Sequence, residues 1–332
     1  MEHFRTEFPI EEAKLKLNYS HRIFCMGSCF TESIGAYLVG YKFKTFINPF
    51  GIVYNPLSIH NQMQMLLTDK IFKREDLFFH NEVWNSFFHH GKFSHPDAEM
   101  ALENINNTLD RARKELMRTD LLIVTLGTAW VYEFLKTSQV VSNCHKVPEK
   151  EFRRFQLSVD KIADTLGTTL NQLKKLNPKL QVLFTISPVR HMKDGAAENQ
   201  LSKATLLVAV HKMIRQCNYA HYFPAYEIMM DDLRDYRFYE ADMVHPSSIA
   251  IEYIWEKFYK AYIDKRAFMV MMQIEEIDAA RNHRPRNPHS EAHKAFLKKA
   301  LVKIMQLKAA YPDLDFEQEI AYFNADSKEQ VY

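Results

Sequence analysis

The chain has 332 residues, of which 47% are hydrophobic and 25% are charged, so it is long enough to bury a large core in one or two domains. Its 43 basic and 41 acidic side chains nearly balance, which gives no reason to expect nucleic acid or an anionic membrane as its partner. No apolar run approaches the roughly 18 to 20 residues of a membrane helix, and the polar, acidic amino terminus is unlike a secretion signal. The four cysteines show no disulfide framework. We therefore expect a cytoplasmic protein.

Strands and helices are predicted to alternate along the chain. Short apolar segments bounded by turn residues or charges predict five strands, over residues 22–26, 42–47, 121–126, 180–186 and 220–223. Helical periodicity predicts helices over residues 31–39, 56–67, 97–118, 151–176, 199–216 and 248–264. Strands that alternate with helices of this length pair in parallel through right-handed crossovers. The predicted fold class is therefore α/β, a three-layer α/β/α arrangement around a mainly parallel five-stranded sheet.

The first predicted strand passes directly into a helix through a turn of small residues, Gly27-Ser28-Cys29. Such a turn places a side-chain oxygen at the carboxyl end of the strand and aims the first free N–H groups of the helix at it. Ser28 is therefore a candidate nucleophile, and the N–H of Cys29 is a candidate oxyanion donor. Two alternatives stay open. Ser28 could only cap the helix, or the thiol of Cys29 could be the nucleophile, since the pKa of a thiol tends to fall at the start of a helix.

A candidate base and its partner lie far downstream, where Asp242 and His245 precede the amphipathic segment 249–263. A serine hydroxyl becomes a good nucleophile only when an imidazole takes its proton, and the imidazole needs an acceptor on its other nitrogen. Ser28, His245 and Asp242 are therefore predicted as nucleophile, base and orienting acid. The alternative is that His245 is a helix-capping or core histidine.

These motifs resemble the GSCFA family, a bacterial group that is itself similar to the SGNH/GDSL hydrolases. Six stretches in the same order, spread over about residues 15–265, carry the resemblance: Gly27–Phe30, Asn48–Pro56, Leu126–Trp130, Asn143–Pro148, Ser187–His191 and Asp242–Ser247. The resemblance implies a flavodoxin-like strand order and hydrolysis of a small acyl ester, with a carbohydrate as one candidate for the alcohol that carries the acyl group. It implies no metal and no organic cofactor.

The SGNH pattern also implies a set of oxyanion donors at the ends of the first three strands. Gly51 matches the glycine of the second block, whose N–H would help hold the oxyanion. The third block departs from the pattern, because Gly127 and Thr128 are followed by Ala129 where the pattern has asparagine. Loss of one such donor costs about two to three orders of magnitude in rate, so another group is expected to substitute. Thr128 is the nearest replacement, and the sequence does not rank the other candidates, which are Asn48, Asn85, Asn143 and His145.

Further side chains are predicted to reach the same edge of the sheet. The aromatic and histidine-rich insert over residues 78–90 would form either a pocket wall or a satellite hydrophobic cluster. A second insert, residues 130–150, carries Asn143 and His145 as candidate binding residues, and its spacing predicts no metal site. The guanidinium of Arg190 suits a carboxylate or phosphate, so an anionic substrate group is a hypothesis. Its alternative is an ion pair with one of three acids, Glu227, Asp231 and Asp232.

The composition changes after residue 265, where basic and methionine-rich helical segments follow. We therefore predict a catalytic domain over residues 1–265 and a helical extension over residues 266–332. The basic face between residues 281 and 308 is predicted to be solvated, with docking of nucleic acid or an acidic partner as the alternative. The same helices are where we would expect a homodimer contact.

The sequence thus predicts a serine esterase that forms an acyl-enzyme on Ser28. The same residues would make an O-acyltransferase if a sugar hydroxyl replaced water as the acceptor. A catalytically inactive binding module is the alternative from another class. Ala129 favours that alternative, whereas the retained Ser28, Asp242 and His245 argue against it.

Overall fold

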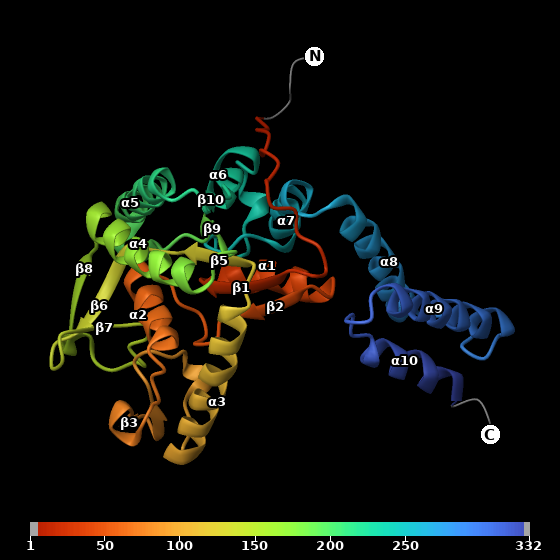
Figure 1. Cartoon of the computed structure of the whole chain (residues 1–332), viewed down its shortest axis with the longest axis horizontal. Helices are drawn as coiled ribbons and strands as arrows, with labels where there is room; N and C mark the ends of the chain where they lie inside the picture. The colour runs from red at the N-terminus through yellow and green to blue at the C-terminus, as the bar shows by residue number, and fades with distance from the viewer. Residues whose placement is uncertain (1–5, 329–332) are drawn as a thin grey trace. The chain divides into compact units, whose positions relative to one another are not determined.

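The computed structural model describes residues 6–328 and contains a central five-stranded parallel sheet (Figure 1). The strands lie in the order β10-β9-β5-β1-β2. Their bounds are β1 (Arg22–Gly27), β2 (Lys44–Ile47), β5 (Leu121–Leu126), β9 (Gln181–Ile186) and β10 (Ala220–Tyr222). The predicted α/β class, the five predicted strands and the flavodoxin-like order are therefore confirmed.

The register of the sheet brings the ends of its central strands to one level. Gly27 at the end of β1 is paired with Thr125 of β5, and Thr125 is paired with Thr185 of β9. The residues that follow these strands therefore share one edge of the sheet, where open α/β sheets bind ligands.

Long helices follow or precede each strand. They are α1 (Cys29–Gly40), α2 (Pro56–Leu67), α3 (Ala98–Met117), α4 (Val159–Leu176), α5 (Gly195–Gln216) and α7 (Ser248–Tyr262), with a short α6 (Ala225–Glu227) before the last of them. Side-chain caps set several starts: Asn55, Asp97 and Ser158 accept hydrogen bonds from backbone N–H groups of α2, α3 and α4 respectively. The helices around the sheet confirm the layered arrangement.

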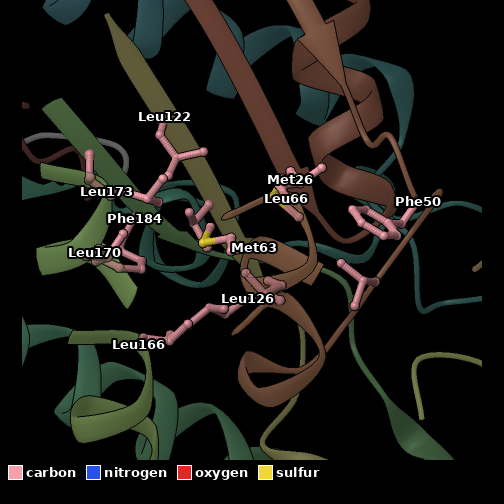
Figure 2. Packing of buried hydrophobic residues seen from close by; sticks show 14 of the residues in the cluster. Met26, Phe50, Met63, Leu66, Leu122, Leu126, Leu166, Leu170, Leu173 and Phe184 are labelled. Atoms are coloured by element: carbon pink, nitrogen blue, oxygen red, sulfur yellow. The ribbon is translucent and has the colours of Figure 1, made fainter. Parts of the chain in front are cut away.

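The core lies between one face of the sheet and helices α2 to α5. Alternate strand residues, among them Met26, Leu122 and Phe184, are buried in it together with side chains of these helices. Figure 2 shows the α4 side chains Leu166, Leu170 and Leu173 gathered near Leu122 and Phe184, with Met63 and Leu66 of α2 closer to Met26. The intervening strand residues Ile23, Cys25 and Ile123 are buried as well, and in a strand they point to the opposite face. Both faces of the sheet are thus covered, as is usual for parallel sheets.

One predicted helix is wrong in its first part. The segment predicted as helical over residues 151–176 begins with a strand, β8 (Phe152–Gln156), and only then continues as α4. β8 pairs antiparallel with β6 (Trp130–Phe134), which also pairs with β7 (Gln139–Val141). This pairing with a strand made earlier in the chain overrides the local helical periodicity, and Ser158 caps the shortened helix.

The aromatic insert forms a hairpin and a hydrophobic cluster. Its strands are β3 (Phe78–His80) and β4 (Val83–Asn85). His89 is 1% exposed and its ring packs against Phe50, Phe72 and Phe93. These contacts favour the satellite cluster over a pocket wall.

We expect His89 to make the protein less stable in mild acid. Burial lowers the pKa of His89 to about 3, whereas an unfolded histidine titrates near 6.5. Between these two values the unfolded chain binds more protons than the folded one, so stability is full above about pH 6.5 and falls as the pH is lowered toward 3. Urea unfolding between pH 7 and 4.5 should therefore show a steeper loss for the wild type than for His89→Leu. The exposed control His289→Leu should keep the wild-type slope, and equal slopes in all three proteins would refute this explanation.

The described chain divides into two compact units. The first contains the described part of Met1–Ile10, with Arg22–Ala36 and Thr45–Lys257, and the second contains Glu11–His21, Tyr37–Lys44 and the described part of Phe258–Tyr332. The second unit includes helices α8 (Lys265–Asn282), α9 (Glu291–Ala310) and α10 (Glu317–Lys328). Within it Lys42 donates a 2.6 Å hydrogen bond to the buried carboxylate of Glu319. The domain boundary at residue 265 and a homodimer contact through these helices stay predictions. Across residues 6–328 no helix is long and apolar enough to span a membrane.

Candidate active site

Ser28 lies at the junction of β1 and α1, and its backbone is fixed by the sheet. The preceding Gly27 has a φ of +142°, and a Cβ there would lie 2.2 Å from the carbonyl oxygen of Thr125, so only glycine fits. The N–H of Ser28 donates to the same carbonyl oxygen at 3.2 Å. Ser28 is 0% exposed, and its Oγ has no hydrogen-bond partner among the described residues. The alternative that Ser28 serves only as a side-chain helix cap is therefore wrong.

Asn48 braces this turn from the end of β2. Its side-chain Oδ1 accepts a 2.9 Å hydrogen bond from the N–H of Gly27, and its own N–H donates to Cys25. Asn48 is 2% exposed and has a φ of +43°, in the left-handed region that asparagine tolerates. The sequence could not rank the asparagines as oxyanion donors. In the structure Asn48 is bonded to the Ser28 turn, whereas the side-chain amide of Asn85 donates within the aromatic hairpin.

The backbone N–H of Gly51 is not free in this structure, contrary to its predicted role. It donates a 2.8 Å hydrogen bond to the carbonyl oxygen of Asn48. Gly51 has a φ of +82°, and a Cβ at this position would lie 2.2 Å from the Cβ of His90. Both observations explain the glycine by backbone conformation and close packing.

Gly127 and Thr128 are also engaged. Both N–H groups donate to the carbonyl oxygen of Tyr54, at 2.7 and 3.0 Å. The Thr128 hydroxyl is 3.0 Å from the Ser202 hydroxyl and accepts from the N–H of Trp130. Thr128 therefore organises its own loop, and its hydroxyl is not directed at Ser28 by any of these bonds.

Asp242 and His245 form the pair that the sequence predicts. The distance between His245 Nδ1 and Asp242 Oδ2 is 2.7 Å, and the other carboxylate oxygen accepts from the N–H groups of His245 and Val244 at 2.9 and 2.8 Å. The His245 N–H above all, and then the imidazole, lower the pKa of Asp242 to about 2. The two side chains are 50% and 49% exposed. His245 is thus not a core residue, and Ser247, not His245, accepts from an N–H at the start of α7. His245 Nε2 is not hydrogen-bonded to Ser28.

The thiol of Cys29 does not have the low pKa expected at a helix start. Burial above all raises the pKa of Cys29, the N–H groups of Phe30 and Cys29 lower it by less, and nearby Glu32 adds a still smaller increase. The thiol is therefore held in its protonated form, which is a poor nucleophile. This corrects the expectation that led Cys29 to be considered as an alternative to Ser28.

Lys203 of α5 is a site residue that the sequence analysis missed. It is 1% exposed, and its Nζ donates to the carbonyl oxygens of Gly127 and Ser187 at 2.8 and 2.7 Å. These carbonyls follow β5 and β9, so the ammonium lies at the edge of the sheet that carries Ser28. Burial lowers the pKa of Lys203 to about 7, and the charge of Arg190 contributes to the lowering.

Arg190 and His191 follow β9 on the same edge. The N–H of Arg190 donates to the carbonyl oxygen of Val244 at 3.2 Å, which ties this loop to the Asp242–His245 segment. The His191 ring packs edge-on against Tyr54, and burial, with Lys203 and His245 nearby, lowers the pKa of His191 to about 4. His191 is therefore neutral near pH 7.

Asn143 and His145 lie in the second insert and are engaged there. The Asn143 side chain accepts from the N–H of His145, and His145 Nε2 is 2.8 Å from the carbonyl oxygen of Ser86. None of these hydrogen bonds reaches Ser28 or His245. Within residues 6–328 no group of three or more His, Cys, Asp and Glu side chains is arranged to hold a metal ion.

A cavity of about 920 Å³ lies away from these residues. It is lined by side chains of α2, of the β6–β8 sheet and of the start of α4, together with Phe88 of the aromatic insert. Neither Ser28 nor the Asp242–His245 pair lines it. The carboxyl edge of the main sheet therefore stays the candidate site, on the basis of its side chains.

The fold and these residues define an α/β protein of flavodoxin-like strand order with a buried serine at the end of its first strand. The chain belongs to the GSCFA family, whose model matches residues 22–258. A second model, described as the C-terminal domain of GSCFA domain proteins, matches residues 274–329. A search of curated protein sequences finds no match.

Solved structures show a distant likeness to carbohydrate esterases. A carbohydrate esterase family 2 enzyme with a carbohydrate-binding domain from Corynascus thermopiles (Myceliophthora fergusii) is 20% identical over 43% of this chain and 36% of its own, with a TM-score of 0.28. An acetyl xylan esterase from the rumen bacterium Butyrivibrio proteoclasticus is 10% identical over 73% of this chain and 63% of its own, with a TM-score of 0.37. A family 3 carbohydrate esterase from Clostridium thermocellum is 10% identical over 76% of this chain and 97% of its own, with a TM-score of 0.35. The chain thus spans less than two thirds of the first two proteins, and TM-scores this low say nothing about its activity.

Proposed function

We propose that this protein is a serine esterase that hydrolyses a small acyl ester through an acyl-enzyme on Ser28. Ser28 Oγ attacks the acyl carbon, His245 takes the serine proton and returns it to the leaving alcohol, and water then releases the acyl group with His245 again as base. The observation that carries the proposal is the buried, unpartnered Ser28 Oγ at the start of α1. A buried hydroxyl without a partner costs free energy, and a role as the nucleophile would explain why this hydroxyl is kept there.

The geometry of the Asp242–His245 pair suits a general base. Asp242 accepts from the Nδ1 side of His245, which leaves Nε2 to accept a proton. Asp242 stays ionised near pH 7, because its pKa is about 2, so it can stabilise the imidazolium. Catalytic hydrogen bonds are often long or absent before substrate binds, and the Ser28–His245 contact is proposed to form then.

The oxyanion is proposed to bind at the start of α1. The N–H of Cys29 belongs to the residue directly after the nucleophile, as in other strand–turn–helix nucleophile turns. The positive, amino-terminal end of the α1 helix dipole also favours negative charge there. Asn48, whose Oδ1 already braces the turn, is proposed to replace the missing asparagine at Ala129. Its Nδ2 lies 3.5 Å from Glu32 Oε1 and would donate to the oxyanion in place of that carboxylate. The acyl acceptor is proposed to be water. Transfer to a sugar hydroxyl would use the same residues.

Labelling with a fluorophosphonate, mapped by mass spectrometry, tests the proposal. We expect one adduct on Ser28 of the wild type and none in Ser28→Ala. Ser187→Ala is the matched control, because Ser187 is equally buried on the same edge of the sheet, and it should still be labelled at Ser28. An adduct on Cys29 would move the nucleophile by one residue. A folded protein without any adduct would favour the binding module instead.

A further inference from the structure

The guanidinium of Arg190 lacks a partner within the described part of the chain. Its Nε is buried and makes no hydrogen bond there. The three acids that the sequence offered as partners are engaged elsewhere: Asp231 binds Arg234, Asp232 binds Lys257, and Glu227 accepts from the hydroxyl of Tyr222. The alternative of an ion pair with these acids is therefore wrong.

A second cation lies close to Arg190. The charge of Arg190 helps to lower the pKa of Lys203, and the hydrogen bonds of Lys203 go to two neutral carbonyl oxygens. The other titratable groups whose charges or rings face Lys203 are Cys29 of α1, His191 of the loop after β9 and Tyr226 of α6. None of these is a carboxylate. Glu32 lies near Cys29, but no carboxylate of the described residues is bonded to Arg190 or Lys203. Partly buried positive charges are normally paired, so these two groups lack a partner.

Both cations belong to the edge of the sheet that carries the candidate nucleophile and base. The Arg190 backbone is bonded to Val244, beside His245. The charge of Lys203 reaches Cys29, the residue after Ser28. An anion that neutralised this pair would therefore lie within the region where the ester is proposed to bind.

We propose that the ester cleaved at Ser28 carries an oxyanionic group, a carboxylate or a phosphate, that is bound by Arg190 with Lys203 behind it. The planar guanidinium offers parallel N–H groups that match two oxygens of such a group. Lys203 is almost fully buried and, in its protonated form, acts on the anion through its charge. This inference rests on the proposed function for the reaction, but the binding of the anion does not depend on catalysis.

Calorimetric titration of the Ser28→Ala protein with succinate and, separately, with inorganic phosphate tests the binding. At least one of the two anions should bind, and Arg190→Gln in the same background should weaken it about 10- to 100-fold. The control Arg237→Gln, which removes an equal charge from an exposed side chain that faces Asp235, should bind the anion as before. Preference for succinate over phosphate, or the reverse, identifies the carboxylate or the phosphate. Absence of binding by both anions, or equal binding to the Arg190→Gln protein, overturns the inference.

Ester kinetics separate this inference from the proposed function. The kcat/KM of mono(4-nitrophenyl) succinate should exceed that of 4-nitrophenyl butyrate, mainly through KM, and Arg190→Gln should reduce the ratio about 10- to 100-fold. Hydrolysis of both esters with a ratio that Arg190→Gln does not change overturns the anionic substrate and leaves the esterase standing. Arg190-dependent binding of an anion by a protein that hydrolyses neither ester supports the anion site and counts against the esterase.

Discussion

Replacing His245 with alanine is expected to lower kcat/KM for an ester substrate by about four to six orders of magnitude, the range typical of a general base in a serine triad. The effect should be of this size because Ser28 Oγ has no base bonded to it in the described chain, so none stands ready to replace His245. Asp242→Asn should cost about four orders of magnitude, since it removes the acceptor that fixes the tautomer of His245. Both are measured with a chromogenic ester, and fluorophosphonate labelling of Ser28 should slow in parallel.

His191→Ala is the informative control for this prediction. His191 lies on the same edge of the sheet, but burial lowers its pKa to about 4, which makes it a weak base. Its replacement should therefore have a much smaller effect than that of His245. If His191→Ala abolished activity and His245→Ala did not, His191 would be the base and the assignment of His245 would be wrong.

Replacing Lys203 with methionine is expected to destabilise the protein by about 2 to 5 kcal/mol near pH 8. The change leaves the carbonyl oxygens of Gly127 and Ser187 without their donor in a buried place, and each unsatisfied buried acceptor costs about 1 to 3 kcal/mol. The loss is measured as the difference in the free energy of unfolding in urea between the variant and the wild type.

The pH dependence of this difference identifies the amine as its source. The pKa of Lys203 is about 7 in the folded protein and near 10.4 when unfolded. Between these values the unfolded wild type binds more protons than the folded one, so wild-type stability rises with pH through this window and is lost as the pH falls toward 7. The cost of Lys203→Met should therefore be larger at pH 9 than at pH 7. Lys212→Met, which removes a lysine of the same helix that is bonded to Asp160, should cost much less and should not cost more at pH 9 than at pH 7. A cost of Lys203→Met that is independent of pH would mean that Lys203 titrates normally.

The fold was predictable because its signals are local. Each strand of the main sheet is a short apolar run between turn residues, and the parallel pairing follows from the helices between them. β8 was missed because its extended form depends on pairing with β6, which no periodicity within residues 151–176 reveals. Its sequence contains Arg153 and Arg154 beside two phenylalanines, a pattern that also fits one face of a helix.

The site was predictable only where its candidate residues lie close together in the sequence or within a recognisable turn. Asp242 and His245 are three residues apart, and Ser28 is identified by the turn around it. The buried amine of Lys203 could not be foreseen, because a lysine in a helical pattern is normally solvated and its burial depends on how α5 lies against β5 and β9. The sequence also could not show that the backbone N–H groups of Gly51 and Gly127 already donate to the carbonyl oxygens of Asn48 and Tyr54. Only the three-dimensional structure reveals these hydrogen bonds.

The pairing of β1 with β5 has a consequence for how the protein is made. Ile23 of β1 is in register with Leu121 of β5, so α1, β2, α2 and α3 all leave the ribosome before β5, the partner of β1 on the side away from β2, exists. Non-local pairing of this kind forms slowly, and until then the apolar side chains of β1 are open to wrong contacts. The Ser28 turn needs the carbonyl oxygen of Thr125 to close, and Asp242 and His245 are synthesised later still. The proposed site is therefore complete only after residue 245 has been made, and a chain interrupted before β5 would expose the apolar side chains of β1 without closing the Ser28 turn.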